Sequence, residues 1–265
     1  GNDALVVSGT TGESPVLDEN ERATLYREAV RASRGKGKVI AGTGGYNTDE
    51  SIHLSQMAAE CGVDGLLQVA PYYNKPPQEG LYRHFKAIAG ATHLPLILYN
   101  VPSRTSLNLS DETTLHLSEI DNILGIKEAG SDMGQIARII HAARPDFRVW
   151  SGNDNETFYI MAMGGYGVVS VASHLVGSQI KQMMGLLLEG DVERAGAEHR
   201  RLLPIFKIMF TIANPIPVKY SLNQAGFNVG TPRLPLVNPD DQVAASIDEV
   251  VSRYDIDLPV PAAAR

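Results

Sequence analysis

Short apolar segments alternate with stretches of helical periodicity along most of the chain, and this alternation constrains the fold more than any other feature. Seven such segments have the character of strands, at residues 4–8, 38–43, 65–70, 94–101, 123–127, 147–151 and 167–171. They show no clean alternation of polar and apolar side chains, which is typical of parallel strands covered on both faces. The sequence therefore predicts an α/β protein built on a parallel sheet.

Helical segments follow the expected strands. The first begins at Asp18 with Glu21 three residues later, which is the spacing of a capping box. The others are expected near residues 47–61, 78–91, 111–117, 133–143, 156–163 and 178–188. So many βα units favour a TIM (β/α)8 barrel over an open doubly wound sheet. No GxGxxG motif follows the first strand, which weakens a dinucleotide-binding interpretation.

Eight strands are needed to close such a barrel, and the missing one is expected to be the first, because the chain begins inside a strand. We therefore predict a barrel over residues 1–189 with seven visible βα units. After Glu189 only helical patterns occur, which predicts a C-terminal helical extension over residues 190–265. Residues 260–265 are expected to be frayed.

The composition of this 265-residue chain excludes several classes of function. Basic residues are scattered singly and the net charge is −7, so no nucleic-acid partner is expected. No apolar run approaches the length of a membrane span. A single cysteine, Cys61, cannot form an internal disulfide, and we expect a cytoplasmic protein. The seven histidines lack metal-binding spacings, and no motif requires a metal or another cofactor.

One lysine, Lys127, directly follows an apolar run with the length of a buried strand, in the segment NILGIKEA. Burial disfavours the charged form of an amine, so this lysine can be a neutral nucleophile near pH 7. Such a group is typical of Schiff-base enzymes. On this octapeptide alone, a lysine that reaches water or pairs with Glu128 is the more common alternative.

Other unusual residues follow the same strand ends, where barrel enzymes carry their active sites. GTTGE holds Thr10 and Thr11, whose backbone N–H groups and hydroxyls can form an anion nest, or simply a glycine turn. Tyr99 can act as a general acid and base beside Lys127, or be an ordinary core tyrosine. Arg104 offers a planar fork for a carboxylate, or is solvated. Their joint occurrence favours the Schiff-base interpretation.

Six motifs occur in a fixed order: GTTGE, PYYNKP, LYNVPSRT, GIKEA, GGYGVVSV and NPIPVK. Together they resemble the pyruvate-dependent class I aldolase superfamily, which includes dihydrodipicolinate synthase and N-acetylneuraminate lyase, over essentially the whole chain. NVPSRT and NPIPVK are similar to the dihydrodipicolinate synthase branch. The resemblance implies condensation of pyruvate with L-aspartate 4-semialdehyde, a step in diaminopimelate and lysine synthesis.

The resemblance also implies roles for individual residues. Lys127 is the Schiff-base lysine, and Tyr99, Thr11 and Tyr73 form a proton relay. Tyr73 reaches across a tight dimer interface into the neighbouring site, within a homotetramer that is a dimer of dimers. Thr10 contributes with Thr11 to binding of the pyruvate carboxylate.

For the remaining contacts, the resemblance implies that Arg104 binds the carboxylate of the aldehyde and that Val169 lies near the pyruvyl group. Ser14, Glu50 and Tyr72 match an allosteric lysine site of the family. Other positions of that site differ here, Arg22 among them, so weak lysine inhibition or none is expected.

Two features leave alternatives open. Members of the superfamily carry one further strand and helix before the point where this chain starts, so the sequence is trimmed or the unit is lost, with an open seam in the barrel. The function could instead be that of another pyruvate-dependent aldolase or a sugar-acid dehydratase, although a neutral sugar would give Arg104 no carboxylate. A catalytically dead ligand-binding homologue is a further alternative, although every motif residue is intact.

Overall fold

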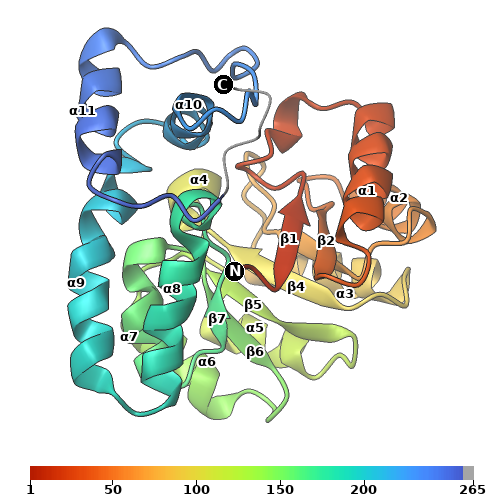
Figure 1. The fold of residues 1–265 in the computed structure, drawn as a ribbon. Helices are drawn as coiled ribbons and strands as arrows, with labels where there is room; N and C mark the ends of the chain where they lie inside the picture. The colour runs from red at the N-terminus through yellow and green to blue at the C-terminus, as the bar shows by residue number, and fades with distance from the viewer. Residues whose placement is uncertain (259–265) are drawn as a thin grey trace. The chain divides into compact units, whose positions relative to one another are not determined.

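A computed structural model describes residues 1–258, and its centre is one all-parallel sheet (Figure 1). The seven strands pair in chain order: β1 (Ala4–Val7), β2 (Lys38–Gly42), β3 (Gly65–Val69), β4 (Leu96–Asn100), β5 (Ile123–Glu128), β6 (Arg148–Ser151) and β7 (Gly167–Val168). The predicted parallel arrangement of seven βα units is confirmed. Within the described residues no ladder joins β7 to β1, so these two strands are the edges of the sheet.

The chain divides into two compact units. The sheet unit comprises residues 3–9 and 17–169, and the helical unit comprises residues 1–2, 10–16 and 170–258. The predicted boundary between a barrel over 1–189 and an extension over 190–265 stays a prediction. Residues 260–265, expected to be frayed, lie outside the described residues.

Helices of the sheet unit connect its consecutive strands. They are α1 (Glu19–Ser33), α2 (Thr48–Glu60), α3 (Gln78–Gly90), α4 (Pro102–Thr105), α5 (Asp111–Ser118), α6 (Met133–Ala142), a 3-10 turn η2 (Asp154–Glu156) and α7 (Thr157–Ala162). The predicted capping box starts α1: Glu21 N–H donates to Asp18 at 2.9 Å, and Asp18 N–H donates to Glu21 at 3.0 Å. This reciprocal pair satisfies two otherwise unpaired donors of the first turn.

Alternate strand residues separate two apolar clusters. Leu98 and Ile126 belong to the large cluster, in which strand residues pack against helix residues such as Phe85. Tyr99, with Leu67 among others, belongs to a smaller cluster whose members come from strands and the residues that follow them. Because successive side chains of a strand point to opposite faces, Tyr99 and its neighbours line the face of the sheet away from the helices.

The helical unit contains the 3-10 turn η1 (Ser14–Val16) and helices α8 (Ser173–Leu188), α9 (Val192–Ile208), α10 (Ile216–Gln224) and α11 (Asp241–Val251). Helices α8 and α9 pack on each other, and α11 contacts both α9 and α10. Helix α8 begins five residues before the expected position 178, but it is kinked at Val176, whose φ of −129° and ψ of 37° are not helical. The kink separates the predicted part of α8 from its first turn.

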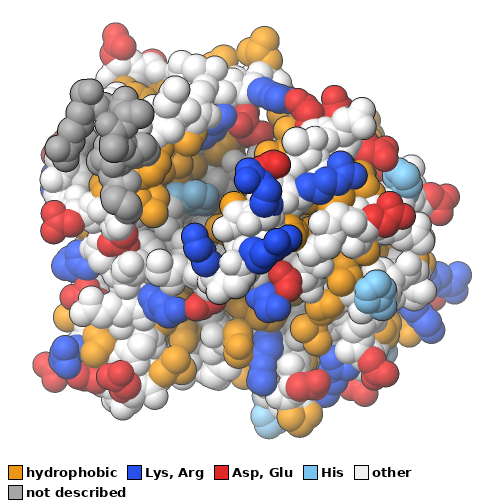
Figure 2. Space-filling view, turned by 45° about the vertical axis from the view of Figure 1, so that its right-hand side comes forward, with side chains coloured by type: hydrophobic (Ala, Val, Ile, Leu, Met, Phe, Trp, Pro, Cys, Tyr) orange, Lys and Arg blue, Asp and Glu red, His pale blue; other side chains and the backbone are white. Residues whose placement is uncertain are grey.

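The surface carries mixed charge. On the face drawn in Figure 2, acidic and basic side chains are interspersed, and hydrophobic side chains lie among them singly and in small groups. This distribution agrees with the net charge of −7 and the scattered basic residues. Among the described helices, none is both long and apolar enough to cross a membrane.

Candidate active site

Lys127 and Tyr99 lie side by side at the carboxyl ends of neighbouring strands. In the β4–β5 ladder Tyr99 pairs with Lys127, and the next residues, Asn100 and Glu128, pair with each other. The Nζ atom of Lys127 lies over the Tyr99 ring, 4.0 Å from its centroid. Tyr99 is only 7% exposed, so its ring is held in place by packing and covers one side of the Lys127 amine.

The electrostatic environment of Lys127 favours its neutral form. Burial of the amine lowers its pKa from the ordinary 10.5 to about 8; the charge of Asp154 opposes this shift and that of Arg104 adds to it. The residue as a whole is half-buried. A substantial fraction of Lys127 is therefore an uncharged nucleophile slightly above neutral pH.

Gly152, the residue directly after β6, has no side chain and so leaves room for the side chain of Lys127. A Cβ atom added at this position would lie 2.7 Å from the Ala129 Cβ and 3.1 Å from the Lys127 Cε. The contact with the Ala129 Cβ is too short for a real Cβ atom, so a larger residue would force a shift there and would also crowd the Lys127 side chain. Glycine at this position therefore keeps space beside Lys127.

Glu128 does not pair with Lys127 in the way that the alternative interpretation expected. Its fully buried carboxylate accepts bonds from Asn100 Nδ2 at 3.0 and 3.1 Å and from Gly130 N–H at 2.7 Å. Asn100 Oδ1 in turn accepts the backbone N–H of Leu109 at 3.0 Å. Burial raises the pKa of Glu128 to about 7, although these donors lower it in part.

This network joins residues that directly follow Tyr99 and Lys127, so it holds the two strand ends in register on the face opposite to the amine. The sequence does not predict it. The available signal was that Asn100 and Glu128 are polar residues at the ends of two otherwise apolar strands.

Asp154 is a second site residue that the sequence does not predict. It is 2% exposed and begins the 3-10 turn η2 after β6. Its negative charge raises the pKa of Lys127, so it stabilises a positive charge on the lysine nitrogen, as in a protonated imine. The only sequence signal is an acidic residue soon after the end of a strand.

Three further predicted residues lie in the sheet unit. Arg104 is exposed on α4, and its charge acts on Lys127. Tyr73 is 90% exposed and has a positive φ of 68°, so its ring projects into solvent. Val169 is half-buried, and its backbone N–H donates to the carbonyl of Ser151 at 2.9 Å.

Residues of the predicted lysine pocket are grouped around Tyr72. The Tyr46 ring meets it edge to face, with centroids 5.1 Å apart. The pKa of Tyr72 is raised by burial and by Tyr46 and Glu50, and lowered in part by Arg22. These side chains therefore share one electrostatic environment. Ser14 belongs to the helical unit, and the lysine site stays a prediction.

Thr10 and Thr11 belong to the helical unit. The backbone N–H of Glu13 donates to the carbonyl of Thr10 at 3.1 Å and closes a tight turn. The Thr11 hydroxyl oxygen accepts a bond from Asn214 Nδ2 at 2.9 Å. These bonds order the turn, and its role as an anion nest stays a prediction.

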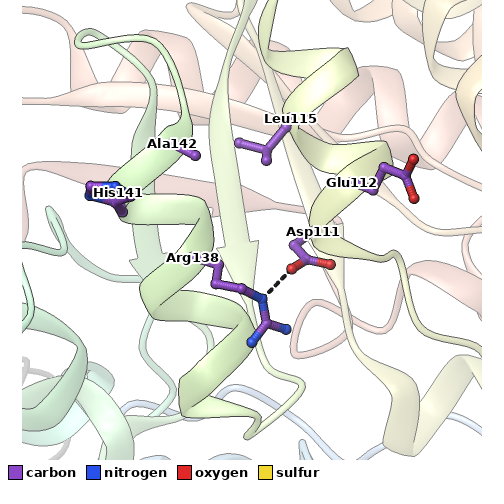
Figure 3. Close-up of a pocket in the computed structure, with 6 residues that line it drawn as sticks. All are labelled: Asp111, Glu112, Leu115, Arg138, His141 and Ala142. Atoms are coloured by element: carbon purple, nitrogen blue, oxygen red, sulfur yellow. Dashed lines mark hydrogen bonds and ion pairs between the residues drawn. The ribbon is translucent and has the colours of Figure 1, made fainter.

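A surface groove between α5 and α6 is separate from these residues (Figure 3). Its lining includes Leu115, His141 and an ion pair between Arg138 and Asp111. The groove contains none of the predicted site residues. Within residues 1–258, no group of three or more His, Cys, Asp or Glu side chains could hold a metal ion.

A lysine of lowered pKa beside a tyrosine, at the carboxyl ends of parallel βα strands, defines the class of barrel enzymes that act through a Schiff base. Comparison with known proteins gives the particular family. Residues 1–254 match the Dihydrodipicolinate synthetase family, and the chain belongs to this family.

Individual relatives agree with this assignment. The 4-hydroxy-tetrahydrodipicolinate synthase of Dehalococcoides mccartyi strain CBDB1 is 54% identical over 260 residues, which are 98% of this chain and 88% of the relative. The crystal structure of the Cyanidioschyzon merolae enzyme with lysine bound has a TM-score of 0.93 at 43% identity, covering 94% of this chain and 85% of that one. A structure described as the first monomeric dihydrodipicolinate synthase variant has a TM-score of 0.93 at 42% identity, covering 95% of this chain and 85% of that one.

Proposed function

We propose that this chain condenses pyruvate with L-aspartate 4-semialdehyde to give 4-hydroxy-tetrahydrodipicolinate, in the pathway to diaminopimelate and lysine. The observation that carries the proposal is the Lys127 amine, with its lowered pKa, 4.0 Å from the centroid of the Tyr99 ring. The relatives named for this activity, at about half identity over nearly the full chain, support it.

The chemistry begins at the neutral amine of Lys127. It attacks the carbonyl carbon of pyruvate, a C–N bond forms and water leaves, which gives a protonated imine. This cation withdraws electrons, so the pyruvyl methyl group loses a proton and the imine becomes an enamine. The enamine carbon attacks the aldehyde carbon of the second substrate, the aldehyde oxygen takes up a proton and becomes a hydroxyl, and the protonated imine forms again. The amino group of the second substrate then attacks the imine carbon, Lys127 leaves as a free amine, and the ring is closed.

Several of these steps move protons. We assign this work to Tyr99, Thr11 and Tyr73, whose hydroxyls can both donate and accept. Thr10 and Thr11 bind the carboxylate of pyruvate through the turn that they form, and Val169 borders the pyruvyl group. The charge of Asp154 stabilises the protonated imine, since it already raises the pKa of Lys127.

Arg104 is proposed to bind the carboxylate of the aldehyde. Arg104→Ala should therefore weaken use of the aldehyde far more than formation of the pyruvate imine. Loss of a charged, bidentate contact is worth about 2–5 kcal/mol when the bound substrate buries it. The measurement is the aldehyde KM in a coupled assay, beside borohydride trapping with pyruvate alone.

Arg104→Lys provides the matched control, because it keeps the charge but loses the planar fork. It should fall between the native chain and Arg104→Ala. If Arg104→Ala reduced imine formation and aldehyde use equally, Arg104 would be a structural residue. The same assay separates the alternatives: another pyruvate-dependent aldolase or dehydratase would not consume the semialdehyde, and a dead homologue would not form the imine.

Tyr73 is proposed to complete the site of a second copy of the chain. A tyrosine that is 90% exposed on its own subunit is available for such a contact. Mixing inactive Tyr73→Phe with inactive Lys127→Ala should restore activity, because a heterodimer has one site that carries neither change. A mixed dimer without activity, after subunit exchange is verified, would contradict this role. The homotetramer and the cytoplasmic location stay predictions.

A further inference from the structure

The NPIPVK segment contacts the GTTGE turn at two points within the helical unit. At one end, Asn214 Nδ2 donates to the Thr11 hydroxyl at 2.9 Å. At the other end, Lys219 Nζ lies 2.6 Å from the Glu13 carboxylate. Two residues of one short turn are therefore held by two residues of a segment about 200 positions away in the chain. Such contacts fix the turn more firmly than its own bonds alone.

Glu13 is held from several directions. Its second carboxylate oxygen accepts the backbone N–H of Arg233 at 2.7 Å, and Lys219 also donates to the carbonyl of Thr231 at 2.9 Å. The Lys219 and Glu13 side chains are only 16% and 13% exposed, so water screens their attraction weakly. Although burial alone would raise the pKa of Glu13, the bonds from Lys219 and Arg233 outweigh it and lower the pKa. The Glu13 carboxyl is therefore charged near neutral pH.

The backbone conformation of Glu13 is unfavourable and needs stabilising contacts. Its φ of 57° lies in the left-handed region, which is unfavourable for a residue other than glycine, asparagine or aspartate. A strained residue persists only where its surroundings fix it. The bonds from Lys219 and Arg233 supply that restraint, and they set the path of the turn from Thr10 to Glu13.

Asn214 contacts the GTTGE turn through a hydrogen bond to Thr11. It is 5% exposed, and its carbonyl oxygen is buried with no partner among the described residues. An unsatisfied buried acceptor is unfavourable. The bond that the amide makes through its nitrogen to Thr11 is therefore the interaction that gives a reason for an asparagine at this position. Because the Thr11 oxygen accepts this bond, its own proton is left to donate to another group.

We propose that Asn214 and Lys219 form a loop clamp that positions the GTTGE turn for the substrate carboxylate. Within the loop clamp, the bond from Asn214 to the Thr11 oxygen directs the Thr11 proton away from Asn214 and toward the substrate. The loop clamp rests on the roles proposed for Thr10 and Thr11. Its members are positioning residues, because neither is assigned a contact with the reacting atoms.

Lys219→Met tests the charged end of the clamp. Methionine keeps much of the length of lysine, but it leaves the carboxylate of Glu13 without its partner. The pyruvate KM should rise roughly 10- to 100-fold, the range for loss of a hydrogen bond to a charged group, with a smaller change in kcat. Lys207→Met is the matched control, since Lys207 is exposed in the last turn of α9, and it should keep the native KM.

Asn214→Asp and Asn214→Ala test the other end. Aspartate has the shape of asparagine but only accepts hydrogen bonds when ionised, so Thr11 would have to donate its proton to it. The loop clamp therefore predicts a larger fall in kcat for Asn214→Asp than for Asn214→Ala. A purely structural role predicts the reverse order, because alanine removes the side chain altogether.

Melting temperature and borohydride trapping with pyruvate accompany each variant. Should Lys219→Met not fold, Lys219→Arg and the two Asn214 variants still decide the matter, with Lys219→Arg expected near the native KM. Native KM and kcat in folded Lys219→Met and Asn214→Asp would overturn the loop clamp while the proposed function stood. Absence of a trapped imine in the native chain would overturn both.

Discussion

Replacing Lys127 with methionine is expected to abolish condensation, with a loss of about four orders of magnitude or more in kcat. Methionine fills a similar space beside Tyr99 but has no amine, so no C–N bond to pyruvate can form. Every later step depends on the imine, and the remaining groups cannot compensate for its loss. The measurement is the coupled assay with both substrates at saturation.

The fold of this variant should survive. Burial lowers the pKa of Lys127, so the folded state disfavours the ammonium, and at pH values below about 8 the lysine weakens folding relative to an apolar residue. Lys127→Met should therefore melt no lower than the native chain at pH 7. Lys36→Met, at an exposed position after α1, is the control and should keep full activity. Activity within tenfold of native in a folded Lys127→Met protein would contradict the Schiff-base mechanism.

Replacing Tyr99 with phenylalanine is expected to lower kcat by about 100- to 10,000-fold, the usual range for loss of a general acid–base group. Phenylalanine keeps the ring that lies 4.0 Å from Lys127 Nζ, and it removes only the hydroxyl. The packing of the smaller cluster around Tyr99 should therefore be retained. Single-turnover trapping should show slower formation of the imine on Lys127.

Tyr82→Phe serves as the control for this substitution. Tyr82 packs against the large cluster from α3, so it belongs to the helix-covered face of the sheet, and loss of its hydroxyl should leave kcat unchanged. A fall of less than about tenfold in Tyr99→Phe would mean that the hydroxyl takes no part in proton transfer. The Tyr99 ring would then only pack beside the Lys127 amine.

The pairing of Lys127 with Tyr99 could be anticipated from the sequence for a physical reason. Consecutive βα units place consecutive strands side by side, so residues that end two successive apolar runs become neighbours. The order of the sheet and the starts of most helices follow from the same local patterns. The short β7, two residues against the five expected, could not be anticipated, because an apolar run does not state which of its residues find a partner strand.

Contacts between residues far apart in the sequence, and the burial of residues that face the helices, could not be predicted from the sequence. Whether Glu128 is buried depends on the cover that other elements provide, and not on its neighbours in β5. The bonds from Asn214 and Lys219 to the GTTGE turn span about 200 residues, and no spacing rule connects such positions. The NPIPVK motif was visible in the sequence, but its contacts were not.

Borohydride trapping is the most direct test of Lys127 as the residue that forms the imine. The native chain is treated with pyruvate and borohydride at pH 7 and at pH 9, digested, and examined by mass spectrometry. We expect the added mass of a reduced pyruvyl group on the peptide that contains Lys127. Trapping should be faster at pH 9, because the pKa of about 8 makes more of the amine neutral there. Label on a different lysine, or no label on the folded protein, would contradict the proposed mechanism.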